Sequence, residues 1–275
     1  MKSGRFLQSV NALAAAGADR LIPHGRFRRA LSECYSRALE LLTIGRGYPT
    51  EINGQMFRID PRYRWAIRPA YEREIAEYLS SRVMPGSVCF DIGANVGVYV
   101  LQLSAWSAPN GRIVAFEPNP GTFPVLERHV ALNGLVSRVT LVPKGVGASP
   151  GSALLYDSEA GSGLSRIGGS HPGIAVAVTP TRIDITTIDM YCAETGVVPD
   201  WILIDVEGYE FEVLRGAVDT LRRHAPRVVI ELHDHILSEE SRLAGERLLA
   251  ELGLAVIPLG TVPGRQERFV TLGPM

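Results

Sequence analysis

With 275 residues, the chain has room for one α/β domain with an appendage or for two small domains. Its 28 Lys and Arg residues nearly balance 29 Asp and Glu residues, so the formal net charge is -1 and no overall field draws it to nucleic acid or to a membrane. The three cysteines are scattered without a CxxC pair, which argues against a disulfide framework or a zinc site. No run reaches the roughly 18 apolar residues that a membrane span requires. We therefore expect a cytoplasmic protein that binds no nucleic acid and has no transmembrane segment.

The first 48 residues are predicted to be helical. Residues 1–20 have the basic start and alanine-rich stretch of a signal peptide, but polar residues interrupt the apolar part, which favours an ordinary amphipathic helix. The excess of arginine in this segment indicates a solvated face, and the alternative is peripheral contact with an acidic partner or an anionic lipid surface. A stripe of apolar side chains near helical spacing follows: Phe27, Leu31, Tyr35, Leu39 and Leu42.

A hairpin and a further helix come next. Asn53-Gly54 lies between two short strand-like runs and is typical of a type I′ turn, which predicts a hairpin over residues 50–64. Apolar residues at helical spacing from Tyr71 to Val83 predict a helix, which Pro85-Gly86 ends. We divide the chain into an N-terminal segment of helices and hairpin, residues 1–70, and a main domain, residues 71–275.

From residue 87 the pattern changes to short apolar runs rich in β-branched residues. Helix-length segments lie between these runs, and one such segment carries Phe211, Leu214, Val218 and Leu221 on one face. Strands that are apolar on both faces and alternate with helices indicate a parallel sheet covered on both sides. A helix over residues 239–252 and two strands close the chain. The predicted strand runs are SVCFDI, RIVAFEP, RVTLVPKG, WILIDVEG, RVVIELHD, AVIPLG and RFVTLG.

Residues 148–199 interrupt this alternation. Two strand-like runs, ALLY and IAVAV, surround the polar loop GSGLSRIGGSHPG, so we expect an inserted hairpin and loop beside the sheet. Loops on a rigid scaffold often determine specificity, and Arg166 and His171 in this loop could contact a sugar or a phosphate-bearing acceptor. An ordinary surface loop is the alternative.

Four of the main strands end in acidic residues: Asp91, Glu117, Asp205, and Glu231 with His233. In an open parallel sheet, ligands bind at the carboxyl ends of the strands. We therefore expect these side chains to meet in one cleft, although each could instead cap the helix that follows it.

The loop after the first strand, DIGANVG, has glycines that let the backbone approach a ligand closely. It is not the GxGxxG loop whose helix receives a pyrophosphate, and Asp91 at its entrance would repel one. S-adenosylmethionine (SAM) instead presents a sulfonium and an ammonium group. Glu117, at the end of the next strand, is placed to accept both ribose hydroxyls, a role that NAD enzymes share.

These motifs resemble the FkbM family of SAM-dependent methyltransferases. The resemblance rests on VCFDIGANVGVY, AFEPNP, TTID, ILIDVEGYEFEVLRGA and VIELH, and extends from about Tyr71 to about His235. It implies a Rossmann-like class I methyltransferase domain with a mostly parallel seven-stranded sheet and a terminal antiparallel hairpin. The family usually has lysine before the aspartate of the fourth strand, whereas this chain has Leu203-Ile204. The first 50 residues lie outside the shared part, so the resemblance gives them no role.

The resemblance and the positions together assign the cofactor site. The glycine loop is expected to wrap the methionine end of SAM, Asp91 to lie beside its ammonium, and Glu117 to bind the ribose. Lys144-Gly145-Val146 is placed at the adenine pocket by its position alone. The residues predicted to bind SAM are Asp91, Gly93, Asn95, Gly97, Glu117, Asn119 and Gly145.

Asp205 and His233 are the predicted catalytic residues. Asp205 ends the fourth strand nearest the expected methyl group, and either side chain could remove the proton of an acceptor hydroxyl. For Glu207 and Glu210, a position at a helix N-terminus is a sufficient structural reason, and for Glu210 a role in the site is an equal alternative. A metal would need several carboxylates in tight geometry, which the sequence does not establish, so we assign no metal ligand.

The sequence thus predicts a SAM-dependent methyltransferase that acts on a hydroxyl of a sugar, glycan or secondary metabolite. One alternative is a non-catalytic module that binds SAM or a protein partner on the same fold. The other is a NAD-dependent oxidoreductase, which Asp91 and the missing GxGxxG oppose. Neither the acceptor nor the oligomeric state follows from the sequence.

Overall fold

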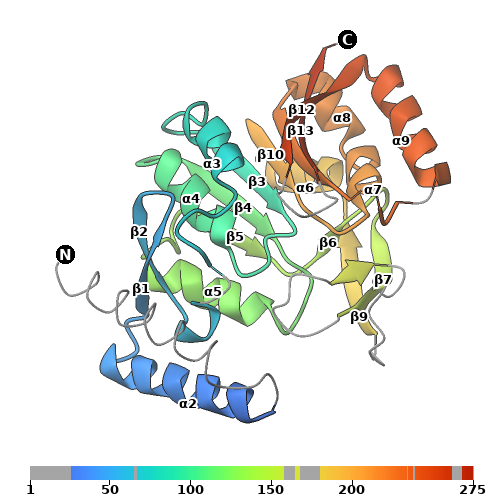
Figure 1. Cartoon of the computed structure of the whole chain (residues 1–275). Coiled ribbons are helices and arrows are strands. Elements are labelled where there is room, and N and C mark those ends of the chain that lie inside the picture. The colour runs from blue at the N-terminus through green and yellow to red at the C-terminus, as the bar shows by residue number, and fades with distance from the viewer. Residues whose placement is uncertain are drawn as a thin grey trace. The chain divides into compact units, whose positions relative to one another are not determined.

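A computed structural model describes the protein over residues 26–64, 67–157, 165–167, 180–233, 235–237, 239–261 and 268–274 (Figure 1). The predicted helix over residues 1–20, the strand IAVAV and His171 lie outside these ranges. The chain divides into two compact units, Met1–Tyr71 with Ala131–Gly134 and Glu72–Val130 with Leu135–Met275. Within the described residues, no helix is both long and apolar enough to cross a lipid bilayer.

The first unit contains helix α2 (Arg26–Leu42), the antiparallel strands β1 (Tyr48–Ile52) and β2 (Gln55–Ile59), and the short 3-10 helix η1 (Pro61–Tyr63). Asn53 and Gly54 both have positive φ, 46° and 83°, as the predicted type I′ turn requires. Asn133 pairs with the edge strand: its Oδ1 accepts from the Arg58 N–H at 2.8 Å and its Nδ2 donates to the Arg58 carbonyl at 2.7 Å.

One detail of the expected stripe on α2 is wrong. Leu39 is buried, with 2% of its surface exposed, but Leu42 is 73% exposed. Leu42 is the last residue of the helix, and the chain then turns through Ile44, which has a positive φ. A helical stripe buries its residues only along the part of the helix that packs against a neighbour.

The second unit is built on a seven-stranded sheet in the order β12-β13-β11-β10-β3-β4-β5, and Figure 1 shows β3, β4 and β5 side by side. β3, β4, β5, β10 and β11 are parallel, while β13 runs antiparallel to both β11 and β12. This arrangement confirms the predicted mostly parallel sheet with an antiparallel terminal hairpin. The strands are β3 (Val88–Ile92), β4 (Arg112–Phe116), β5 (Val139–Val142), β10 (Trp201–Ile204), β11 (Arg227–Leu232), β12 (Leu254–Thr261) and β13 (Arg268–Pro274).

Helices connect the strands as the alternating pattern predicted. The predicted single helix after β10 is wrong, because the segment forms two helices, α7 and α8, that meet at Gly216-Ala217. A side chain at Gly216 would place its Cβ 2.0 Å from the carbonyl oxygen of Gly147. The helices are α3 (Arg73–Ser80), α4 (Val98–Trp106), α5 (Phe123–Leu132), α6 (Ile188–Thr195), α7 (Glu210–Arg215), α8 (Val218–His224) and α9 (Glu239–Glu251).

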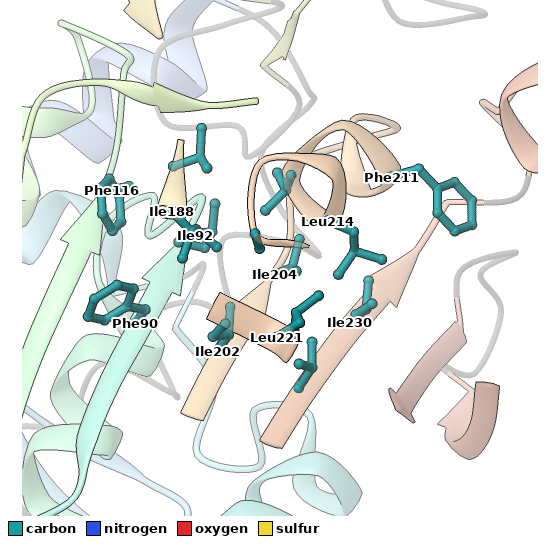
Figure 2. Packing of buried hydrophobic residues seen from close by; sticks show 14 of the residues in the cluster. Phe90, Ile92, Phe116, Ile188, Ile202, Ile204, Phe211, Leu214, Leu221 and Ile230 are labelled. Carbon is teal, nitrogen blue, oxygen red and sulfur yellow. The ribbon is translucent and has the colours of Figure 1, made fainter. Parts of the chain in front are cut away.

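One face of the sheet packs against α6, α7, α8 and α9 through a buried apolar cluster. Alternate residues of a strand point to the same face, so Phe90 and Ile92 of β3 join Phe116 of β4 there. Figure 2 shows Phe90 and Phe116 at the left of this cluster, and Leu214 of α7 and Leu221 of α8 near Ile230 in its centre. Tyr191 of α6, which is partly buried, stands edge-on to Phe90 and Phe116 with ring centroids 5.5 and 5.1 Å apart. The intervening Asp91 therefore points to the opposite face.

The insertion forms a sheet of its own rather than a single hairpin. Its order is β6-β9-β7-β8, with β6 parallel to β9 and the remaining pairs antiparallel. The predicted run ALLY lies in β7, whereas β9 was not expected as a strand. The elements are β6 (Gly145–Val146), β7 (Gly151–Tyr156), β8 (Arg166–Ile167) and β9 (Thr181–Thr186).

Candidate active site

A cleft of about 640 Å³, including its solvent-open mouth, lies at the carboxyl ends of β3, β4 and β10 in the second unit. One wall comes from the loop after β3 and the end of β4, and another from the turn after β10. The insertion closes a third side through β6, β7 and β8. The lining residues are Ile92, Gly93, Asn95, Phe116, Glu117, Pro118, Thr122, Lys144, Gly145, Val146, Leu155, Ser165, Ile167, Asp205, Val206 and Glu207.

The loop between β3 and α4 is held close to two neighbouring strand ends. The N–H groups of Gly93 and Ala94 both donate to the carbonyl of Phe116 at 3.0 Å. Gly93 has a φ of 86°, and a Cβ there would lie 1.9 Å from the carbonyl oxygen of Asp205. Only glycine fits this combination of positive φ and close approach. Gly97, also at positive φ, then begins α4.

Glu117 directly follows β4 and braces the loop. Its Oε2 accepts the N–H of Asn95 at 2.7 Å, and its Oε1 accepts the N–H of Asn119 at 2.8 Å. The side chain is buried, and burial raises the pKa of Glu117 to about 7, although these two hydrogen bonds oppose the shift. Each carboxylate oxygen keeps a second acceptor position. The residue can therefore hold the loop and also accept hydrogen bonds from a ligand.

Asn119 ties this region to the insertion. Its side-chain Nδ2 donates to Asp157 at 2.8 Å and to the hydroxyl of Ser165 at 2.9 Å, while its Oδ1 accepts the N–H of Gly121 at 2.8 Å. The Ser165 hydroxyl also donates to Asp157 at 3.1 Å. Asn119 is 3% exposed, so its side chain acts as a buried bracket that holds Ser165 at the cleft wall.

Asp91 is a buried carboxyl group with an unsatisfied atom. Only 2% of the residue is exposed, and its Oδ2 has no hydrogen-bond partner within the described residues. Burial raises the pKa of Asp91 to about 8, and the charges of Asp205 and Glu117 add to the shift. A buried carboxylate without a partner is costly, so this position favours a cation or a hydrogen-bond donor.

A second acidic group gathers around His233, which directly follows β11. The imidazole Nδ1 lies 2.6 Å from Oε1 of Glu210, and its Nε2 lies 3.4 Å from Glu207 Oε2 and 3.9 Å from Asp205 Oδ1. Burial alone would lower the pKa of His233. The hydrogen bond with Glu210 and the charges of Asp205 and Glu207 outweigh burial and raise that pKa to about 9.

Glu231, on β11, completes this group. It is 3% exposed, and its Oε1 has no hydrogen-bond partner among the described residues. Burial and the nearby charges of Asp205 and Glu72 raise its pKa strongly. Of the strand-end residues, Glu117 and Asp205 line the cleft, whereas Asp91, Glu231 and His233 are buried close to Asp205.

The sequence profile of the Methyltransferase FkbM domain matches residues 91–253, which is more than half of the chain. The chain belongs to the FkbM methyltransferase family. The matched range begins at Asp91 and includes Glu117 and the acidic group around His233.

Individual proteins are also similar to this chain. A protein named Methyltransferase 1 from Beauveria bassiana is 29% identical over 187 residues, which cover 62% of this chain and 73% of the relative. Hexuronic acid methyltransferase AglP from Haloferax volcanii is 29% identical over 176 residues, covering 62% of this chain and 66% of the relative. A solved FkbM methyltransferase from Methylobacillus flagellatus is 17% identical with a TM-score of 0.49; the match covers 78% of this chain but only 54% of that protein.

The structure of this FkbM methyltransferase places the predicted residues in two groups. The cleft is lined by Gly93, Asn95, Glu117, Gly145 and Asp205. The other predicted residues do not line it. Asp91, Asn119 and His233 are buried, and Gly97 is the N-cap of α4.

Glu210, for which the sequence left a structural and a site role equally open, lies in the network around His233. The residue begins α7 and is fully buried, and its Oε1 contacts both the His233 ring and the N–H of Gly208, at 2.6 and 2.9 Å. A position at a helix N-terminus alone would not bury a carboxylate. The motif DVEGYE contains Glu210, but it does not show that the partner of Glu210 is His233. That histidine follows β11 and lies 23 residues away in the chain. Of two further lining residues, Thr122 carried no signal in the sequence, and Ser165 lies in the loop GSGLSRIGGSHPG, from which only Arg166 and His171 were named.

Proposed function

We propose that this FkbM methyltransferase uses SAM to methylate a hydroxyl oxygen of a sugar, glycan or secondary metabolite. The observation that carries the proposal is the unsatisfied, buried carboxyl group of Asp91 next to the glycine loop and Glu117. A ligand with a positive group would stabilise the charged form of Asp91, whereas that form would repel a pyrophosphate. This charge argument supports SAM over NAD.

The residues present fit SAM. Asp91 would face the positively charged methionine end, and the backbone of Gly93 lets the ligand come close to the loop. Glu117 retains acceptor positions for ribose hydroxyls, since its two backbone hydrogen bonds use one position on each oxygen. Gly145 and Val146 give an apolar edge that would suit adenine. Bound SAM supplies an electrophilic methyl group on a positively charged sulfur.

Asp205 and His233 are proposed to act on the acceptor. Asp205 lines the cleft with its side chain 34% exposed, so a hydroxyl entering from solvent can reach it. His233 lies behind it, and Glu210 fixes the ring through Nδ1. The hydroxyl proton must leave as the new bond forms. The Asp205 carboxylate can bind the hydroxyl and receive this proton. Orientation and exclusion of water supply the remaining advantage.

The acceptor class is supported by the printed name of one relative, hexuronic acid methyltransferase AglP. A polar, carboxylate-rich cleft wall is suited to hydrogen bonding with several hydroxyls. The formal net charge of -1 gives no overall attraction to nucleic acid, which supports a small-molecule or glycan acceptor.

Calorimetric titration with SAM, S-adenosylhomocysteine (SAH) and NAD tests the cofactor. We expect the wild type to bind the first two at micromolar concentration and not NAD. Glu117→Ala should abolish binding, while Glu127→Ala, which alters an exposed carboxylate on α5, should not. Binding of NAD alone, or SAM binding that survives Glu117→Ala unchanged, would refute the proposal.

A non-catalytic SAM-binding module is the rival function. The two are separated by SAH release with a panel of sugar and polyketide acceptors. A methyltransferase should release SAH with at least one acceptor and lose this activity in Asp205→Ala while keeping SAM binding.

A further inference from the structure

The acidic group around His233 contains a three-residue arrangement suited to a metal ion. One carboxylate oxygen each from Asp205 and Glu231 and one ring nitrogen of His233 all lie within 4.8 Å of one another. We propose that these three residues bind a divalent cation. Two carboxylates and one imidazole are ligands that Mn²⁺ accepts readily, and Mg²⁺ would use the carboxylates.

An acidic cluster alone would not support a site, but Glu231 provides an independent reason. This residue is 3% exposed, and its Oε1 lacks a hydrogen-bond partner among the described residues. Its side chain hydrogen-bonds with Asp205, and Asp205, Glu72 and Glu207 are close enough to repel its charged form. Burying a carboxylate beside other carboxylates is unfavourable unless a proton or a cation offsets the charge. A cation between Glu231 and Asp205 would do so.

The orientation of His233 fits the same role. Metal-binding histidines usually donate their second ring N–H to a carboxylate, which fixes the tautomer and the ring. Here Nδ1 lies 2.6 Å from the fully buried Glu210. Nε2 points toward Asp205 and Glu207, at 3.9 and 3.4 Å. A cation would displace the proton that the raised pKa of His233 keeps on this nitrogen.

The site would be closed on one side and open on the other. Glu231 and His233 are buried, whereas Asp205 is about one third exposed and lines the cleft. The cation would therefore have open positions toward the space that an acceptor enters, as catalytic rather than purely structural metals do.

The chemical role of the cation rests on the proposed function. A divalent cation lowers the pKa of a bound hydroxyl, so Asp205 and His233 would act on the acceptor through the ion. The O–H bond would break, and Glu207, which also lines the cleft, would take its proton and pass it to solvent. The freed oxygen lone pair would form the O–CH₃ bond as the C–S bond of SAM breaks, and the electron pair would stay on sulfur in SAH.

The test is titration of chelator-treated, full-length protein with MnCl₂ and, separately, with MgCl₂, followed by calorimetry. We expect saturable Mn²⁺ binding by the wild type that is weakened by at least roughly tenfold in Glu231→Gln. Glu240→Gln, which alters an exposed carboxylate on α9, should bind like the wild type. Asp205→Asn provides a second variant at a partly exposed position, in case Glu231→Gln does not fold.

SAH affinity is measured in the same samples and separates the two proposals. Wild-type protein that binds SAH but neither cation overturns the cation site and leaves the methyltransferase proposal intact. Mn²⁺ binding that is equal in wild type, Glu231→Gln and Asp205→Asn also overturns the site. Mn²⁺ binding that the two variants lose, in a protein that binds no SAH, supports the site and refutes SAM as cofactor.

Discussion

The Nδ1 atom of His233 lies 2.6 Å from the Oε1 atom of Glu210, and the Glu210 side chain is completely buried. The first residue of α7 thus fixes the ring of a histidine that follows β11. The same oxygen accepts the N–H of Gly208 at 2.9 Å, so the turn after β10 is held in the same network. While Glu210 holds Nδ1, the Nε2 atom is directed at Asp205 and Glu207, which line the cleft. This orientation serves an action on the acceptor directly or through a cation.

We predict that Glu210→Gln lowers kcat by about 10- to 100-fold, because the neutral amide holds the imidazole less firmly. The KM for SAM should change little, since Glu210 is not among the residues that line the cleft. Turnover is measured as SAH release. Glu212→Gln, on the same helix, removes only a partly exposed ion pair with Arg215 and serves as the control. Equal turnover in wild type and Glu210→Gln would contradict this role.

The convergence of the strand-end acids could be predicted because it follows from topology. Parallel strands end at the same edge of a sheet, so Asp91, Glu117 and Asp205 had to come near each other once the alternation of strands and helices was recognised. No knowledge of side-chain contacts was needed. The glycine loop could be predicted for the same reason, since its position follows directly from the end of β3.

Features that depend on contacts between distant segments could not be predicted. The break between α7 and α8 arises where Gly216 approaches the carbonyl of Gly147. The new helix is then capped by Asp189 of α6, whose carboxylate accepts the N–H groups of Asp219 and Thr220 at 3.0 and 2.8 Å. The apolar pattern alone continues through this break, so it predicted one helix. The burial of Glu210 was missed for the same reason.

The close approach at Gly93 predicts that an alanine there lowers the stability of the fold. A second glycine at positive φ, without such a contact, serves as the comparison. Gly93→Ala should lower the free energy of unfolding by about 2 to 4 kcal/mol, through a strained positive φ and a clash with the Asp205 carbonyl. Gly196→Ala, also at positive φ but with open space around it, should cost only about 1 kcal/mol. Denaturant unfolding of both variants measures the difference. Similar losses at the two positions would show that the contact with Asp205 adds nothing.

The bracket formed by Asn119 should contribute to stability through its buried hydrogen bonds. Asn119→Ala leaves Asp157 and Ser165 without their shared partner and should lower the free energy of unfolding by about 1 to 3 kcal/mol. Ser165→Ala should cost less, because the bond between Asn119 and Asp157 remains. Thermal and denaturant unfolding give both values. A larger loss in Ser165→Ala than in Asn119→Ala would reverse the assignment of the bracket.

The raised pKa of Asp91 predicts how SAM affinity depends on pH. Since that pKa is about 8, the carboxyl group is mostly neutral below pH 8 and charged above it. A cation binds the charged form more tightly, so affinity should rise with pH, by up to about tenfold per pH unit below the pKa, and level off above it. Glu117, with a pKa of about 7, contributes to the slope only below that value. Calorimetry between about pH 6 and 9 should therefore show that Asp91→Asn removes the rise in SAM affinity between about pH 7 and 8. The rise below about pH 7 should remain. An unchanged rise in Asp91→Asn would mean that Asp91 does not face the positive end of the ligand, because titration of SAM itself is the same for both proteins.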